Sequence, residues 1–133
     1  MASLLIITEE FGFAAAAAAL SGPDLAVTHA HAEEAMATAR ADVPDVLAVD
    51  TDSVVEAGAL IAALSLVTRS IVVALAHQAW PGSDEAAAWL RAGADAVLPK
   101  PSGTASPSLA GADREAYGFW FLELHRRLRE DAP

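Results

Sequence analysis

Five short apolar segments alternate with helical segments along the 133 residues, which predicts an α/β fold with a parallel five-stranded sheet. Hydrophobic residues make up 54% of the chain and charged residues 20%, the balance of a packed globular protein. No repeat or linker divides the sequence, and its length suits one domain. We therefore expect residues 1–133 to form a single domain.

The expected strands are short, branched and apolar, as strands buried on both faces of a parallel sheet are. The second has the weakest pattern, and the third ends at Asp50. In chain order, we expect strands at Leu4–Ile7, Leu25–Thr28, Val46–Val49, Ile71–Ala76 and Ala96–Leu98.

The intervening segments favour helices. Six consecutive alanines support the first helix, and Ser21-Gly22-Pro23 ends it. Ser83 suits the N-cap of the fourth helix. We expect helices at Phe11–Leu20, His31–Ala41, Asp52–Val67, 83–93 and Asp113–Arg129, with a lengthened Pro/Ser/Gly/Thr loop at 101–111 before the last.

Composition excludes several classes of function. The chain has 8 basic and 18 acidic residues, a net charge of −10, so its surface repels phosphates and disfavours direct nucleic-acid binding. The absence of cysteine excludes disulfides and thiol catalysis. No apolar run is long enough for a membrane helix, and no basic segment precedes Leu4–Ile7 as in a signal peptide. We expect a cytoplasmic protein without a membrane partner.

Polar residues follow the expected strands at the edge where parallel sheets collect function. Glu9 follows the first strand, Asp50 and Asp52 follow the third, and Lys100, the sole lysine, follows the fifth. If the first and third strands are neighbours, these carboxylates converge near a cation. Such a cluster suits Mg²⁺ and a phosphoryl-like group. The alternative is that the acids merely cap the helices that follow them.

Four segments resemble the receiver domain of bacterial two-component response regulators, across essentially the whole chain. They are Leu4–Glu10, Pro44–Asp50, Gly58 and Gly93–Pro101, of which Gly93-Ala-Asp-Ala-Val-Leu-Pro-Lys-Pro101 is the most specific. The resemblance implies a flavodoxin-like (βα)5 fold with strand order 2-1-3-4-5. It also implies a role in phosphorelay signal transduction.

The resemblance assigns roles to the strand-end residues. Asp50 matches the phosphoacceptor, which takes a phosphoryl group from a histidine kinase or a small donor. Glu9 and Asp50 match Mg²⁺ ligands, and Asp52 would offer the metal its backbone carbonyl. Lys100 matches the lysine that pairs with the phosphoryl group. The catalytic pair would be Asp50 and Lys100.

The chain also departs from the family at several positions. Thr8 replaces an acid of the metal pocket, and Val54 replaces a proline after the acceptor. Ala76 stands where a Ser or Thr grips the phosphoryl oxygen, and Val97 where an aromatic ring responds. A hydrogen bond to a charged group contributes about 1.5–3 kcal/mol, so losing this hydroxyl weakens the switch. We expect weak Mg²⁺ binding and a damaged readout.

Two kinds of function remain open. The leading hypothesis is a receiver module, not an enzyme, whose output runs through contacts with a kinase or other signalling protein. Its variant is a degenerate receiver that works without phosphorylation. The rival is a small-ligand binder, although Glu9-Glu10 is acidic where a phosphate-binding loop would be glycine-rich. Phe119 and Leu122, opposite the apolar stripe of the last helix, predict a homodimer contact.

Overall fold

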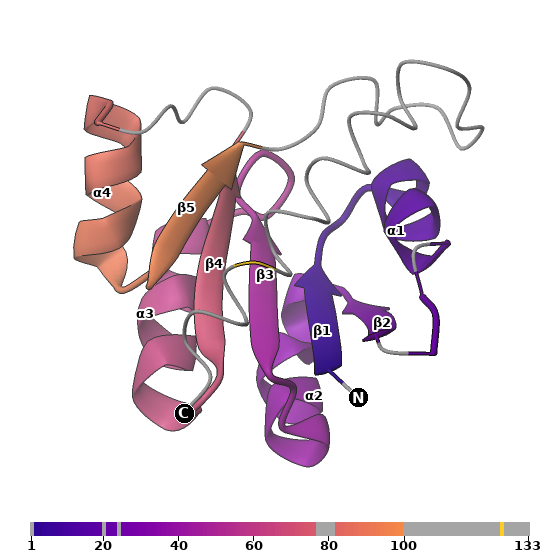
Figure 1. Ribbon diagram of the computed structural model, residues 1–133. Helices are drawn as coiled ribbons and strands as arrows, with labels where there is room; N and C mark the ends of the chain where they lie inside the picture. Colours follow the sequence, from indigo (N-terminus) through magenta and orange to yellow (C-terminus); the bar gives the residue numbers. More distant parts are fainter. Residues whose placement is uncertain (1, 20, 24, 77–81, 100–125, 127–133) are drawn as a thin grey trace.

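The computed structural model describes residues 2–19, 21–23, 25–76, 82–99 and 126 (Figure 1). The strands are β1 (Ala2–Ile7), β2 (Leu25–Ala30), β3 (Val46–Asp50), β4 (Ile71–Ala76) and β5 (Ala96–Pro99). The helices are α1 (Phe11–Ala18), the short 3-10 turn η1 (Ala32–Glu34), α2 (Ala35–Asp42), α3 (Ala57–Val67) and α4 (Asp84–Ala92).

The five strands form one sheet in the order β2-β1-β3-β4-β5, and every neighbouring pair is parallel. This confirms the predicted fold class and strand order. Strand β1 pairs with β2 and β3, so Ile7 lies between Ala30 and Val49. The carboxyl ends of β1 and β3 are therefore adjacent, and the residues that follow them meet at one edge of the sheet.

Apolar residues cover both faces of the sheet. Alternate residues of each strand face opposite sides, so Leu4 and Ile6 of β1 join one core cluster while Leu5 and Ile7 join the other. Phe13 of α1 packs into the first cluster. Helices α2 and α3 pack into the second and lie side by side behind the sheet (Figure 1). Burial on both faces explains why the strands are continuously apolar.

Helix α3 begins at Ala57, so the prediction of a helix from Asp52 is wrong. Residues 51–56 form turns instead. The Asp50 carbonyl accepts the N–H groups of Ser53 and Val54, at 3.3 and 3.1 Å, which closes a tight turn directly after β3. The chain then passes through Glu56, whose φ of 56° is left-handed, before the helix starts. Helix propensity alone does not anticipate such a local turn.

The fourth helix follows the prediction closely. Ser83 caps it, because its Oγ accepts the Ala86 N–H at 3.1 Å. Gly93, with a φ of 127°, ends it. The loop at 101–111 and most of the predicted last helix lie outside the described residues; Arg126 is helical and exposed. Within the described part of the chain, no helix is long and apolar enough to cross a membrane.

Candidate functional site

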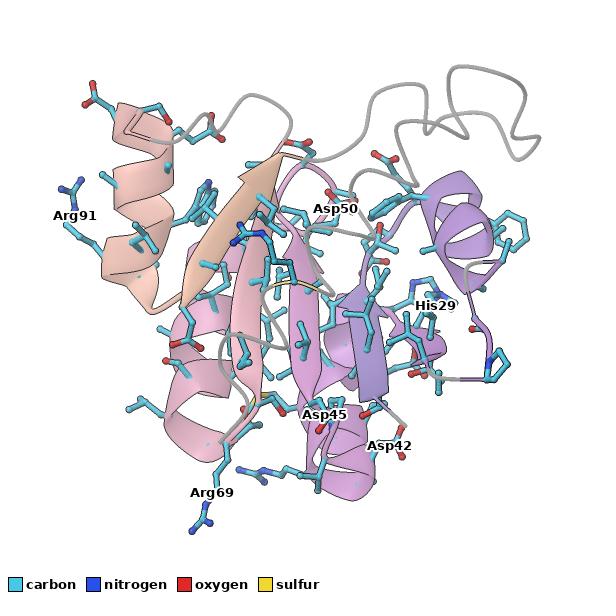
Figure 2. The ribbon with its side chains drawn as sticks, in the orientation of Figure 1. His29, Asp42, Asp45, Asp50, Arg69 and Arg91 are labelled. Carbon is cyan, nitrogen blue, oxygen red and sulfur yellow. The ribbon has the colours of Figure 1, made fainter. Side chains whose placement is uncertain are left out.

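Asp50 is the last residue of β3 and is completely buried, with 0% of its surface exposed. Its neighbour on β4 is Leu75, in the middle of the sheet. The Leu75 carbonyl accepts both the backbone N–H and the hydroxyl of Thr51, at 2.9 and 2.8 Å. These bonds hold the start of the β3–α3 loop against β4. Asp50 lies at the carboxyl end of the sheet (Figure 2).

The Asp50 carboxylate accepts hydrogen bonds from three described residues. Thr8 Oγ1 donates to Oδ2 at 2.7 Å, and Ser53 Oγ donates to the same oxygen at 2.8 Å. The backbone N–H of Asp52 donates to Oδ1 at 3.2 Å. Thr8 is itself buried, with 1% of its surface exposed. Burying a carboxylate is costly unless it is hydrogen-bonded, and these donors offset that cost.

The two hydroxyls also accept hydrogen bonds from the β1–α1 loop. Thr8 Oγ1 accepts the Glu10 N–H at 3.1 Å, and Ser53 Oγ accepts the Glu9 N–H at 3.0 Å. Each hydroxyl has one proton, and both protons are donated to Asp50. Thr8 Oγ1 and Ser53 Oγ therefore lie 3.2 Å apart as two neighbouring donors to the same carboxylate. The network ties the loop after β1 to the loop after β3.

Glu9 contributes its backbone to this network, whereas its carboxylate binds elsewhere. Oε1 accepts the Ala32 N–H at 2.7 Å, and Oε2 lies 2.9 Å from Nδ1 of His31. The hydrogen bond from Ala32 and then the one from His31 lower the pKa of Glu9. Among the described hydrogen bonds, the Glu9 and Asp50 carboxylates thus have separate sets of partners, and their convergence in one pocket stays a prediction.

Magnesium does not fit this arrangement of described residues. Thr8 supplies a hydroxyl that donates to Asp50, and the Glu9 carboxylate is bound by His31 and Ala32. Asp52 reaches Asp50 through its N–H, and its side chain is exposed. Among the described residues, no three His, Cys, Asp or Glu side chains form a group that could hold a metal ion. Lys100 lies outside the described residues, so its predicted place at the rim stays a prediction.

The two switch positions are apolar and packed. Ala76, at the end of β4, is fully buried, and it forms a small cluster with Ala86 of α4. Val97 of β5 is partly buried and packs against this cluster. Val54, in the turn after Asp50, is also buried. In the described structure, aliphatic groups thus occupy the positions where the resemblance implies a hydroxyl and a ring.

Sequence reasoning missed two residues of the site. Ser53 donates to Asp50 from three residues further along the chain, a spacing typical of a tight turn that returns a side chain to the preceding residue. His31, which is exposed, binds the Glu9 carboxylate. A serine in the turn after a strand-end acid was the available signal for Ser53. None was available for His31, whose position depends on the order of the strands.

Solved structures with the same architecture identify the fold. The response regulator domain of Thermotoga maritima CheB superposes with a TM-score of 0.72 at 18% identity, covering 99% of both chains. The chain has the receiver-domain fold. CheY4 of Vibrio cholerae gives a TM-score of 0.72 at 19% identity, over 96% of this chain and 98% of that one.

A third receiver-fold neighbour comes from a complex. CheY6 of R. sphaeroides, solved with the P1 domain of CheA3, gives a TM-score of 0.69 at 24% identity over 97% of each chain. No protein-family model and no curated protein sequence matches this chain. At these identities the likeness establishes the receiver fold, and function has to be argued from the Asp50 network.

Proposed function

We propose that the chain is a receiver-fold signalling module that acts through protein–protein contacts without taking up phosphate at Asp50. The observation that carries this proposal is the buried network in which Asp50 Oδ2 accepts the protons of Thr8 and Ser53. The receiver fold supports the signalling role. The network supports independence from phosphate, because the chain's own hydroxyls hold one oxygen of a carboxylate that is fully buried.

Nucleophilic attack requires a carboxylate oxygen that can reach the phosphorus atom. Asp50 is 0% exposed, and two hydroxyls donate to its Oδ2. Hydrogen bonds to a charged group contribute about 1.5–3 kcal/mol each, so displacing both adds about 3–6 kcal/mol to the barrier. A barrier increase of that size slows the transfer by at least a hundredfold, on the scale of about 1.4 kcal/mol per factor of ten.

Phosphoryl transfer also needs positive charge beside the developing negative charge, which a divalent cation usually supplies. The described residues around Asp50 do not fit such a cation, because Thr8 replaces an acid and the Glu9 carboxylate caps η1 instead. We derive no step through a metal. Asp50 acts here as a structural carboxylate that gathers the two loops above the sheet.

The readout positions support the same proposal. Fully buried Ala76 has no hydroxyl to move toward a phosphoryl group, and Val97 is aliphatic. A ligand shifts a conformational equilibrium only by its different affinities for the two states. With no hydroxyl at position 76, a phosphoryl group on Asp50 would gain no hydrogen bond from this position in an activated state. A constant surface recognised by a partner suits this molecule better than a phosphorylation switch.

The proposed partner is a signalling protein rather than a nucleic acid. The net charge of −10 opposes binding to phosphate backbones. Receiver-fold proteins do bind other proteins, as CheY6 binds the P1 domain of CheA3. A histidine kinase, or another protein of a signalling pathway, is the partner we propose.

Intact-mass spectrometry after incubation with acetyl phosphate and Mg²⁺ tests the proposal. We expect the natural chain to keep its mass. The matched comparison is Thr8→Asp, which replaces one donor with a second carboxylate beside Asp50. The response regulator domain of T. maritima CheB, treated in parallel, checks the reagents. A stoichiometric gain of one phosphoryl group by the natural chain would refute phosphate independence.

The second candidate is a phosphorelay receiver with Asp50 as its acceptor. It is favoured by the place of Asp50 at the end of β3, where the resemblance puts the phosphoacceptor. Under this alternative the natural chain gains mass, and Asp50→Asn abolishes the gain. A gain that survives in Asp50→Asn would assign the modification to another residue and contradict this second candidate.

A further inference from the structure

Helix α3 is apolar apart from Ser65, which is exposed and donates its hydroxyl to the Ala62 carbonyl. Its eleven residues, Ala57–Val67, include no charged side chain. Ile61 and Leu64 are fully buried against the sheet. On the opposite side Ala59 is exposed, and 85% of the Leu66 surface is exposed. A helix that is hydrophobic all round is normally buried all round, so the outer face of α3 has the composition of a covered surface.

The helices on either side of α3 expose charged side chains, whereas α1 resembles α3 in carrying none. Helix α2 exposes Arg40 and Asp42, and α4 exposes Arg91, as helices that face water do. Figure 2 shows Arg91 projecting from α4 at the side of the molecule. In a chain with a net charge of −10, an uncharged helix face is the place where another acidic surface can approach with least repulsion.

We propose that the outer face of α3 docks against the same face of a second copy of this chain, with the two helices antiparallel. A two-fold axis would pass between Ala62 and Ala63. Leu66 of each copy then faces Ala59 of the other, because both lie equally far from the axis. A large exposed side chain thus meets a small one at both ends of the contact, which makes the face self-complementary.

The charges at the two ends of α3 complement each other in this arrangement. Glu56 precedes the helix and Arg69 follows it, and both are exposed. Figure 2 shows Arg69 projecting beyond the end of α3. The single salt bridge among the described residues joins Glu9 to His31, so neither side chain is paired within the described fold. In the antiparallel dimer Arg69 of one copy faces Glu56 of the other, and the two-fold symmetry gives two such pairs.

Charge exchange tests the predicted pairing by sedimentation velocity over a concentration series. We expect Arg69→Glu and Glu56→Arg each to weaken the dimer about tenfold or more, because each places like charges opposite one another twice. The double variant should restore association. Arg40→Glu makes the same change of charge on α2 and should leave the dimer intact. Single variants that dimerise as well as the natural chain would refute the pairing.

A disulfide trap tests the axis, because the natural chain has no cysteine. We expect Ala63→Cys to form a covalent dimer under mild oxidation, while Ala37→Cys, on the exposed side of α2, does not. Leu66→Asp should shift the protein to monomer without loss of helical circular dichroism. A chain that stays monomeric at every concentration, or a dimer disrupted by Phe119→Glu and not by Leu66→Asp, would overturn the proposal.

Discussion

Thr8 determines what the pocket around Asp50 holds. As a hydroxyl it donates to Asp50 Oδ2 and accepts the Glu10 N–H, so it is one of the donors that offset the burial of this charge. A carboxylate at the same place would repel Asp50, and two close carboxylates need a proton or a metal ion between them. The choice between a hydroxyl and a carboxylate at position 8 therefore decides how strongly the pocket attracts a cation.

We predict that Thr8→Asp creates a measurable Mg²⁺ site. Without metal the variant should lose about 1–3 kcal/mol of stability, because Asp50 loses a donor and gains a like charge. At a Mg²⁺ concentration about a hundred times the dissociation constant, binding should return about 2.7 kcal/mol. Thermal unfolding with and without Mg²⁺ measures both effects, with the natural chain as the control. Equal responses of the two proteins would contradict the role assigned to Thr8.

Glu9 provides a pH-dependent test. Hydrogen bonds from Ala32 and His31 lower its pKa from the ordinary value of 4.5, so its contribution to stability is present above that pH and is lost as pH falls through the lowered pKa. We expect carboxyl NMR titration to place the pKa below 4.5 and His31→Ala to raise it only partly, since the Ala32 N–H remains. A pKa unchanged by His31→Ala would show that the ring does not bind this carboxylate.

At the scale of elements, the strands were the predictable part of the fold. Continuous apolar runs such as Ile71–Ala76 are strands because both faces of the sheet are covered. The start of α3 was not predictable from helix propensity, because the turn after Asp50 competes for the same residues. The strand-end position of Asp50 was predictable from sequence. The direction of the Glu9 side chain was not, because its partners come from beyond β2 and meet it only once β2 pairs with β1.

Gly58, in the first turn of α3, and Gly93, at the end of α4, should respond in opposite ways to substitution by alanine. Gly93 has a φ of 127°, and a Cβ there would lie 2.8 Å from the Oγ of Ser65, which is itself bonded to the Ala62 carbonyl. We expect Gly93→Ala to cost about 1–3 kcal/mol. At Gly58 a Cβ would meet the Trp89 ring at 3.7 Å, an ordinary contact. Gly58→Ala should stabilise the protein by about 0.5–1 kcal/mol. Urea unfolding of both variants checks the signs.

At the scale of the whole molecule, the sheet separates two apolar layers and leaves its carboxyl end as the place where loops meet. A signal from Asp50 to β5 would have to cross β4, whose last residue, Ala76, is fully buried and packed beside Ala86. Close-packed interiors transmit strain only where a side chain has two alternative arrangements. The methyl group of alanine has no rotamer to change, so this route offers no second state.

Beryllofluoride with Mg²⁺ mimics a phosphorylated aspartate and therefore tests the whole path. We predict that the amide NMR spectrum of β4 and β5 stays unchanged. The Thr8 and Ser53 hydroxyls already donate to Asp50, and Ala76 has no hydroxyl that could move toward the beryllofluoride group. Losing one hydrogen bond to a charged group reduces the shift in population about tenfold to a hundredfold. Ala76→Thr combined with Thr8→Asp is the comparison in which a response should return. Large shifts at residues 71–76 or 96–98 of the natural chain would show that the domain switches through its buried carboxylate after all.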